Sequence, residues 1–127
     1  MLHHVGIEVA PADLERSVEF WFALGFTQVK PPAALSEFVW LERDETQIHL
    51  MPTDSPAVPP RGHTAVVVPD FENALEALSE GDFKVERRRE HWGAPRAVAI
   101  APGGHRVELM AAPPGAGKPV VEELCGP

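Results

Sequence analysis

An internal repeat is the feature of this sequence that most constrains its fold. Two segments that read as strands, residues 3–10 and 62–69, each run into a polar turn and then a helical pattern. Three extended segments follow in each half, so both halves have the order β-α-β-β-β. A half of about 55 residues would bury only about 60% of its unfolded surface. The two halves are therefore expected to pack together around a cleft between two sheets.

The helical segments of the two halves have matching start and stop signals. Asp13 and Asp70 occupy N-cap positions, and Gly25 and Gly81 follow the last helical residues. Apolar residues recur in both segments at the spacing of one helix face. The predicted faces are Leu14, Val18, Trp21 and Phe22 in the first half, and Phe71, Ala74, Leu75 and Leu78 in the second.

Proline and glycine divide the rest of the chain. Four prolines lie within residues 52–60, too many for regular structure, and they predict a semi-rigid linker between module one (1–51) and module two (61–112). A second Pro/Gly-rich run predicts a tail at 113–127 outside the fold. The prediction is one α+β domain over residues 1–112, built from two tandem βαβββ modules. The remaining strands are expected at about 26–30, 37–42, 46–51, 83–89, 95–101 and 105–111.

Charge and composition exclude several classes of protein. The net charge of −8 repels a phosphate backbone, so nucleic acid is not an expected partner. The first residues have no signal-peptide pattern, and no apolar run approaches the roughly 20 residues that span a bilayer. We therefore expect a cytoplasmic protein that does not enter a membrane. The only cysteine, Cys125, cannot form an intrachain disulfide or a thiolate cluster, so any metal must use histidine and carboxylate ligands.

Four polar residues follow the repeat. His63 lies 59 positions after His4 in the first strands, and Glu108 lies 59 positions after His49 in the last strands. Strand alternation puts the neighbouring apolar residues on the helix side and these four on the other, which predicts that they meet in the cleft. His3 has the opposite parity and is left out. Three imidazoles and one carboxylate suit a divalent ion of the Zn, Fe, Ni, Co or Mn type, with open positions for substrate.

Three stretches carry a further pattern: LHHVGIEV at residues 2–9, LERSVEFW with LGF within 14–26, and PGGHRVEL at 102–109. They resemble the vicinal oxygen chelate superfamily, which contains glyoxalase I, bleomycin-resistance proteins and extradiol dioxygenases. The likeness covers about residues 2–112. It implies paired modules that form a curved mixed sheet around a divalent metal, and a homodimer. The implied ligands are again His4, His49, His63 and Glu108.

The sequence departs from the family pattern at two points. Residues 101–105 (APGGH) replace the usual Asp-Pro-x-Gly-Asn turn, which alters the turn and leaves Glu108 in place. The chain contains no tyrosine, whereas extradiol dioxygenases commonly place one near the substrate. Ring cleavage is therefore less favoured.

Other residues are candidates for roles around the metal. Glu8 shares a strand face with His4 and is a candidate second base, or else a solvated glutamate. Arg96 could pair with an anionic substrate group, or form a salt bridge at a strand edge. Large aromatic residues are candidate pocket walls, or else part of the core. They are Phe38, Trp40 and Trp92.

These residues predict a divalent-metal-dependent enzyme, a glyoxalase-like lyase or isomerase. Its small substrate would chelate the metal through neighbouring oxygens, with Glu108 as ligand and proton carrier and Glu8 as second base. The alternatives are a metal-free small-molecule binding protein of the bleomycin-resistance type and an accessory domain with a decayed site. A site within one chain and a site between swapped modules of a dimer both remain open.

Overall fold

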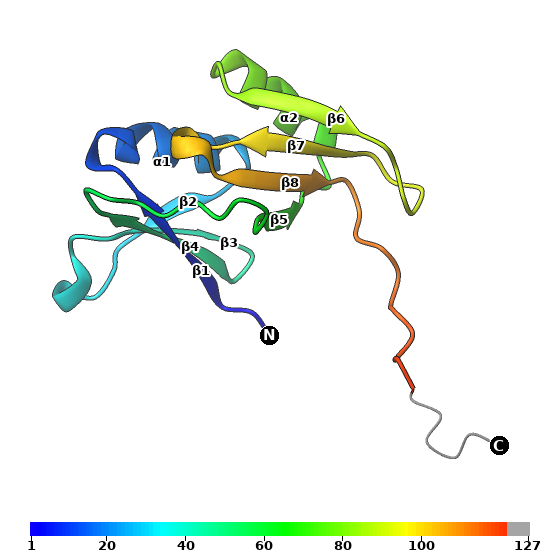
Figure 1. Ribbon diagram of the computed structural model, residues 1–127, viewed down its shortest axis with the longest axis horizontal. Coiled ribbons are helices and arrows are strands. Elements are labelled where there is room, and N and C mark those ends of the chain that lie inside the picture. The colour runs from blue at the N-terminus through cyan, green and yellow to red at the C-terminus, as the bar shows by residue number, and fades with distance from the viewer. Residues whose placement is uncertain (122–127) are drawn as a thin grey trace.

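The computed structural model describes residues 1–121 and confirms two consecutive βαβββ modules (Figure 1). Cys125 lies outside the described residues. Module one contains β1 (His4–Val9), η1 (Pro11–Asp13), α1 (Leu14–Ala23), β2 (Thr27–Val29), η2 (Ala33–Leu35), β3 (Val39–Arg43) and β4 (Thr46–Pro52). Module two contains β5 (Thr64–Val67), α2 (Phe71–Glu80), β6 (Lys84–Arg88), β7 (Arg96–Ile100), η3 (Pro102–Gly104) and β8 (Arg106–Met110). No described helix is long and apolar enough to cross a membrane.

Each module forms its own four-stranded mixed sheet. The strand orders are β1-β4-β3-β2 and β5-β8-β7-β6, and the first pair in each order is parallel while the others are antiparallel. This repetition confirms the predicted α+β fold. The first and last strands of each module are neighbours, so His4 and His49 lie on adjacent strands of one sheet, as the segment of His63 and the strand of Glu108 do in the other.

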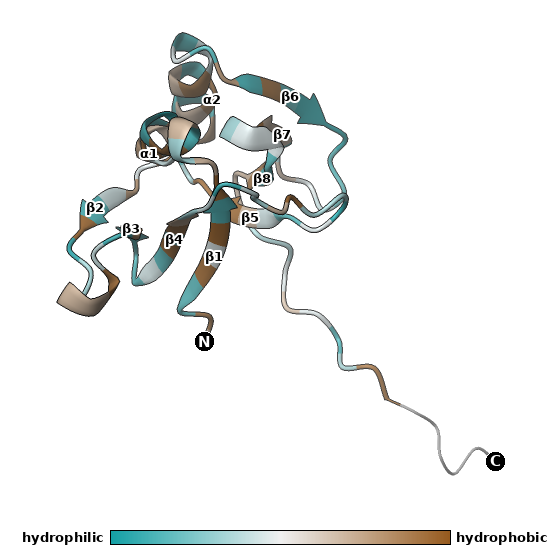
Figure 2. Ribbon diagram, turned by 60° about the vertical axis from the view of Figure 1, so that its left-hand side comes forward, coloured by the Kyte–Doolittle hydropathy of each residue, from teal (hydrophilic) through white to brown (hydrophobic). Residues whose placement is uncertain are grey.

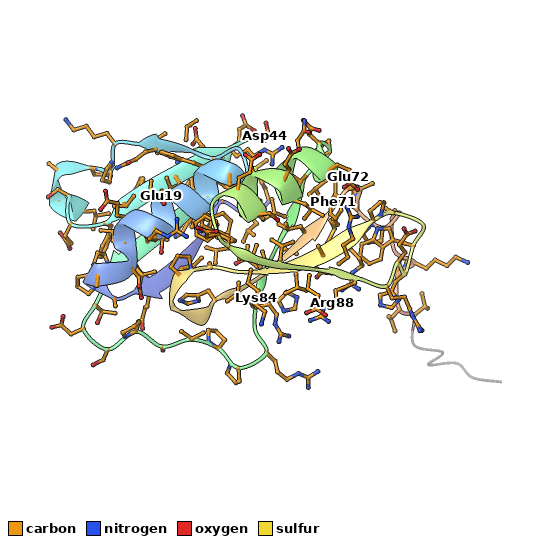
Figure 3. The ribbon with its side chains drawn as sticks, turned by 90° about the horizontal axis from the view of Figure 1, so that it is seen from above. Glu19, Asp44, Phe71, Glu72, Lys84 and Arg88 are labelled. Atoms are coloured by element: carbon orange, nitrogen blue, oxygen red, sulfur yellow. The ribbon has the colours of Figure 1, made fainter. Side chains whose placement is uncertain are left out.

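The two helices pack side by side over the sheets (Figures 1 and 3). The Arg16 side chain links the modules, because its Nη2 donates to the Gly81 carbonyl at 2.7 Å and its guanidinium lies 4.1 Å from the centre of the Phe83 ring. On the other side of the junction, His105 Nε2 lies 2.7 Å from the Glu8 carbonyl oxygen. Side-chain contacts from both modules therefore hold the sheets in place.

The core lies between the helices and the sheets, where hydrophobic residues of β1 and β4 gather (Figure 2). The predicted face of α2 is confirmed, since all four of its apolar residues are buried. The predicted face of α1 is wrong at Phe22, which is 48% exposed. The buried stripe of α1 instead runs through Ser17, Phe20 and Trp21 and continues to the C-cap residue Leu24, with the i, i+3, i+4, i+7 spacing of one helix face.

The helix caps differ from the prediction. Asp13 and Asp70 do occupy the N-cap positions, but neither carboxylate makes a capping hydrogen bond in the described structure. Asp13 ends the short turn η1 and already has helical backbone angles, with φ −98° and ψ −2°. The Asp70 Oδ2 atom accepts instead from Asn73 Nδ2 at 2.8 Å. After α2, Asp82 rather than Gly81 adopts the left-handed conformation, with φ 61°.

Candidate metal centre

The two module-one histidines form part of an aromatic stack. The His4 and His49 ring centroids are 4.0 Å apart with planes inclined by 15°, and the opposite face of His49 stacks on Trp40 at 4.0 Å with parallel planes. Sheet register explains the arrangement, because Trp40 on β3 lies directly opposite His49 on β4. The stack leaves His49 only 8% exposed, so His49 sits in a largely desolvated position.

A chain of polar side chains sets the tautomer of His49. Its Nε2 lies 2.7 Å from Gln47 Oε1, and Gln47 Nε2 donates to Glu42 Oε1 at 2.8 Å. An ionised carboxylate only accepts hydrogen bonds, so the Gln47 amide oxygen faces His49 and receives its Nε2 proton. The Nδ1 atom then holds the free lone pair. Burial, and next the neighbouring His4 and then His3, lower the pKa of His49, which favours the neutral form that binds metals.

The stacked orientation of His4 does not yet suit a shared ion. A metal bound to an imidazole lies close to the ring plane along the nitrogen lone pair, about 2.0–2.1 Å from the nitrogen. Two nearly parallel rings stacked at 4.0 Å cannot both meet that condition for one ion. His4 is exposed, with its Nδ1 2.9 Å from His3 Nδ1, so its ring has room to turn. The nitrogen ligands fit a transition metal, and the His4 rotamer requires adjustment.

The module-two pair is better arranged for a cation. His63 Nδ1 lies 2.9 Å from the Arg61 carbonyl oxygen, which can only accept, so Nδ1 carries the proton and Nε2 the lone pair. That Nε2 is 3.4 Å from Glu108 Oε2, and a carboxylate oxygen is also an acceptor. Two bonds of about 2.1 Å at a tetrahedral angle span about 3.4 Å, so the separation fits two ligands of one ion. The same separation is also that of an ion pair if His63 is protonated.

Arg96 holds the other oxygen of Glu108. Its Nε donates to Oε1 at 2.9 Å, its Nη2 makes an ion-pair contact with the same oxygen at 2.8 Å, and its Nη1 donates to the Arg89 carbonyl at 2.8 Å. The guanidinium lies 6.0 Å from the centre of the Trp92 ring, and Trp92 Nε1 donates to the Ala112 carbonyl. The salt bridge considered in the sequence is therefore present, but it joins the two inner strands β7 and β8 and does not lie at an edge of the sheet. It joins a candidate substrate-binding residue to a candidate ligand.

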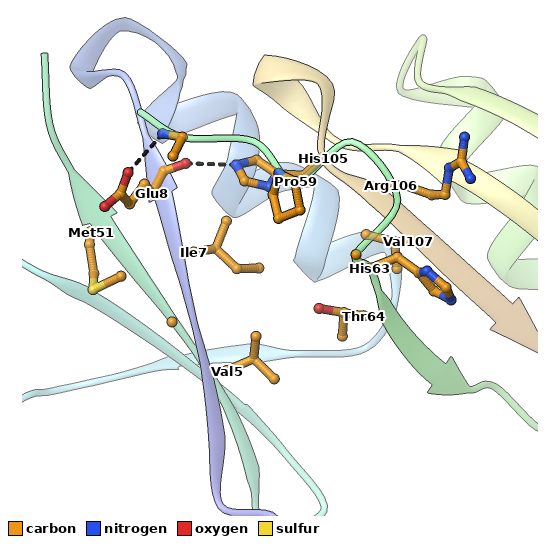
Figure 4. Close-up of a pocket in the computed structure, with 13 residues that line it drawn as sticks. Val5, Ile7, Glu8, Met51, Pro59, His63, Thr64, His105, Arg106 and Val107 are labelled. Atoms are coloured by element: carbon orange, nitrogen blue, oxygen red, sulfur yellow. Dashed lines mark hydrogen bonds between the residues drawn. The ribbon is translucent and has the colours of Figure 1, made fainter. Parts of the chain in front are cut away.

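The His4–His49 pair and the His63–Glu108 pair do not combine into one cluster among the described residues. Among residues 1–121, no group of three or more His, Cys, Asp or Glu side chains is placed to hold one metal ion. The edge strands β1 and β5 face each other across a pocket of about 370 Å³, which the linker borders (Figure 4). Glu8 lies on one side of this pocket and His63 on the other. The candidate ligands thus form two half-sites. The first half-site contains His4 and His49 of module one, and the second contains His63 and Glu108 of module two.

The other candidates are distributed between these regions. Glu8 Oε1 accepts a hydrogen bond from the Ala57 backbone at 2.7 Å, which ties the linker to β1. Trp40 belongs to the first half-site and Trp92 to the second, while Phe38 is half-buried two residues before Trp40. Sequence reasoning did not assign a role to Gln47. Its position on the same strand face, two residues before His49, is the signal that could have indicated one.

Comparison with known proteins gives the family of the chain. The model of the glyoxalase/bleomycin resistance protein/dioxygenase superfamily matches residues 1–109, so the chain belongs to this superfamily. No curated protein matches the sequence. The fold and its duplicated modules are those predicted from the sequence, and the family is the one that the sequence resembles.

Solved structures share the fold at low sequence identity. A Bacillus anthracis protein assigned to the glyoxalase family is 19% identical with a TM-score of 0.77, covering 87% of this chain and 93% of its own. The oxidase ChaP-H2 is 18% identical with a TM-score of 0.71, covering 93% and 98%. TnmS3, an antibiotic binding protein from Streptomyces sp. CB03234, is 17% identical with a TM-score of 0.67, covering 87% and 93%. One fold therefore serves proteins with different named functions.

Proposed function

We propose that this protein is a divalent-metal-dependent enzyme of the superfamily, a glyoxalase-like lyase or isomerase acting on a small substrate with neighbouring oxygens. The observation that carries the proposal is the His63–Glu108 pair, whose two acceptor atoms lie 3.4 Å apart. Two acceptors at this distance favour a cation between them. A bound Zn, Ni, Fe, Mn or Co ion would supply Lewis-acid polarisation of the substrate oxygens.

We further propose that a second copy of the chain completes each centre. His4 and His49 of one copy would face His63 and Glu108 of the other, and a two-fold axis would create two equivalent centres. The separation of the two half-sites within one chain supports this arrangement. The exposed, rotatable His4 ring would leave its stack to face the ion. The functional domain is then residues 1–112 in a cytoplasmic homodimer, with 113–127 as a tail.

The side chains around the half-sites suggest how the protein handles substrate and protons. Arg96 holds Glu108 Oε1, so Oε2 is the oxygen available to bind an ion or carry a proton. Trp40 and Trp92 would border the substrate, one from each half-site, with Phe38 beside Trp40. Glu8 is the candidate second base, and its carboxylate would have to release the Ala57 amide to act.

Metal analysis of untagged protein tests the proposal. We expect about one transition-metal equivalent per chain, and much lower occupancy in His49→Ala and Glu108→Ala. His91→Ala, at an exposed position, is the matched control. Unchanged metal content in both site variants would contradict the ligand assignment.

Mixing the two inactive variants tests the shared centre. In a mixed dimer of His49→Ala and Glu108→Ala chains, one centre carries both substitutions and the other carries neither. Unfolding and refolding the mixture should therefore restore one centre in each mixed dimer, up to about a quarter of all centres for random pairing. Recovery of no metal binding, while the dimer still forms, would place each centre within one chain.

A metal-free binding protein is the alternative. The observation that favours it is the stack of His4, His49 and Trp40, which presents flat rings but no preset pair of histidine ligands. The net charge of −8 would suit a cationic ligand. Absence of metal, together with saturable binding of a cationic aromatic drug such as bleomycin, would favour this function. A dioxygenase remains less favoured because the chain lacks tyrosine.

A further inference from the structure

The guanidinium of Arg96 places a positive charge directly on Glu108 in the second half-site. Arg96 and Glu108 are 16% and 15% exposed at their side chains, so water screens their contact only in part. Every guanidinium nitrogen of Arg96 has a polar contact in this region: Nε donates to Glu108 Oε1, Nη2 forms an ion pair with the same oxygen, and Nη1 donates to the Arg89 carbonyl. The charge is therefore held in place beside the carboxylate.

The form of the contact leaves the metal-facing oxygen open. The Arg96 hydrogen bond and the ion-pair contact with Glu108 both end on Oε1, whereas the usual fork geometry uses both carboxylate oxygens. Oε2 faces His63 at 3.4 Å. Val98, which lies opposite Glu108 in the sheet, is small enough to let the Arg96 side chain reach across from two residues along β7. Arg96 thus neutralises Glu108 without occupying the position next to His63.

We propose that Arg96 makes this centre selective for anionic chelating ligands, specifically small α-keto or α-hydroxy carboxylates. This inference rests on the proposed function. With a divalent ion, three neutral histidines and Glu108, the centre would carry a charge of +1, and Arg96 raises it to +2. A higher positive charge favours a chelator that brings a carboxylate over a neutral diol or carbonyl compound. Arg96 acts as a positioning and specificity residue through Glu108.

The same charge lowers the affinity for the metal itself. The positive charge of Arg96 repels a divalent cation at Oε2 and offsets part of the negative charge of the Glu108 carboxylate. The structure therefore predicts opposite effects of removing the charge: tighter metal binding and weaker anion binding. A residue with only a structural role would weaken both when replaced.

Arg96→Gln and Arg96→Lys test the inference in the full chain, with Arg89→Gln as a control that removes the same charge from an exposed neighbour. The measurements are the Kd for Zn²⁺ by chelator competition and the Kd for oxalate on zinc-loaded protein by calorimetry. We expect Arg96→Gln to tighten zinc about tenfold and weaken oxalate about tenfold. Arg96→Lys should stay within about threefold of the wild type in both, because it keeps the charge.

The outcomes separate the two proposals. A wild-type protein that binds no zinc overturns the proposed function, and this inference with it. Zinc binding with an oxalate Kd that Arg96→Gln leaves unchanged, or with weakened affinity for both zinc and oxalate, overturns the inference alone. So does an Arg96→Lys variant that behaves like Arg96→Gln. If Arg96→Gln does not fold, Arg96→Met replaces it, since an apolar side chain needs no hydrogen-bond partner at this partly buried position.

Discussion

The two half-sites occupy equivalent positions of the repeat and yet differ in character. In module one His49 is held between flat rings, with Trp40 directly across the sheet. In module two Glu108 is held by an ion pair, with Val98 across the sheet. The residue opposite each candidate ligand thus differs in size. The Trp40 ring covers His49, whereas Val98 leaves room for the Arg96 side chain to reach Glu108.

The comparison shows that the two modules keep polar residues at equivalent positions of the repeat while their surroundings differ. In the first pair only His49 is largely desolvated, and the position of its free lone pair depends on the contact with Gln47. The second pair contains a carboxylate, and its two acceptor atoms already lie 3.4 Å apart. The spacing of the second pair therefore suits a cation better, while the charge of Arg96 opposes one.

The largest expected effect is the loss of metal affinity when a candidate ligand of either half-site is replaced. Replacing a residue that only supports a ligand typically costs 10–100-fold in affinity, so removing a ligand should cost more, on the order of 100-fold or above. Glu108→Ala should weaken zinc binding further than His49→Ala, because it removes the only anionic ligand. Chelator competition measures both. Equal losses would mean that the two half-sites contribute alike.

The next effect concerns packing opposite the ligands. Trp40→Ala should destabilise the metal-free protein by about 2 kcal/mol, because a large half-buried ring leaves the stack. Val98→Ala should cost only about 0.5–1 kcal/mol, since it removes two methyl groups. Urea unfolding monitored by circular dichroism gives both values. A larger cost at Val98 would reverse the proposed roles of the two opposing residues.

The ion pair gives a smaller effect on the metal-free protein. Glu108→Ala should cost about 1–2 kcal/mol, because it leaves partly buried donors of Arg96 without their acceptor. His63→Ala, at an exposed residue, should cost less than about 0.5 kcal/mol. The double variant Arg96→Ala/Glu108→Ala should recover part of the loss in the same urea experiment. Additive losses in the double variant would show that the pair contributes no coupling.

The smallest effect is a dependence of stability on pH in the first half-site. The pKa of His49 is lowered in the folded protein, while the unfolded chain keeps the ordinary value of about 6.5. As the pH falls below about 6.5 the unfolded chain takes up the proton first, so the folded state loses stability. Above that pH the residue is neutral in both states, and the effect is absent.

His49→Gln removes this contribution. Unfolding free energies at pH 8 and pH 5 should therefore differ less in His49→Gln than in the wild type. His91→Gln is the matched control, because it makes the same substitution at an exposed histidine. An equal pH difference in the wild type and in His49→Gln would show that His49 does not contribute.

Local patterns predicted most of the fold. The repeat, strand alternation and helix periodicity identified both modules and the α2 face, because each depends on neighbours within a few residues. The predictions that were wrong concern the start of α1 and the face that α1 buries. The short turn η1 brought Asp13 into helical angles without a capping bond, and α1 buries Phe20 where the prediction placed Phe22.

By itself the sequence determined the family, the two modules and the pairs His4–His49 and His63–Glu108, because a repeat and a two-residue strand period are properties of the chain. Only the tertiary structure decided what surrounds each pair. Sheet register set Trp40 against His49 and allowed Arg96 to reach Glu108. The tertiary structure also leaves the two pairs outside any common cluster of three or more such side chains among residues 1–121. These contacts form between neighbouring strands, so they depend on how the strands are aligned and on how far a side chain extends. The spacing of residues along a single strand does not determine either.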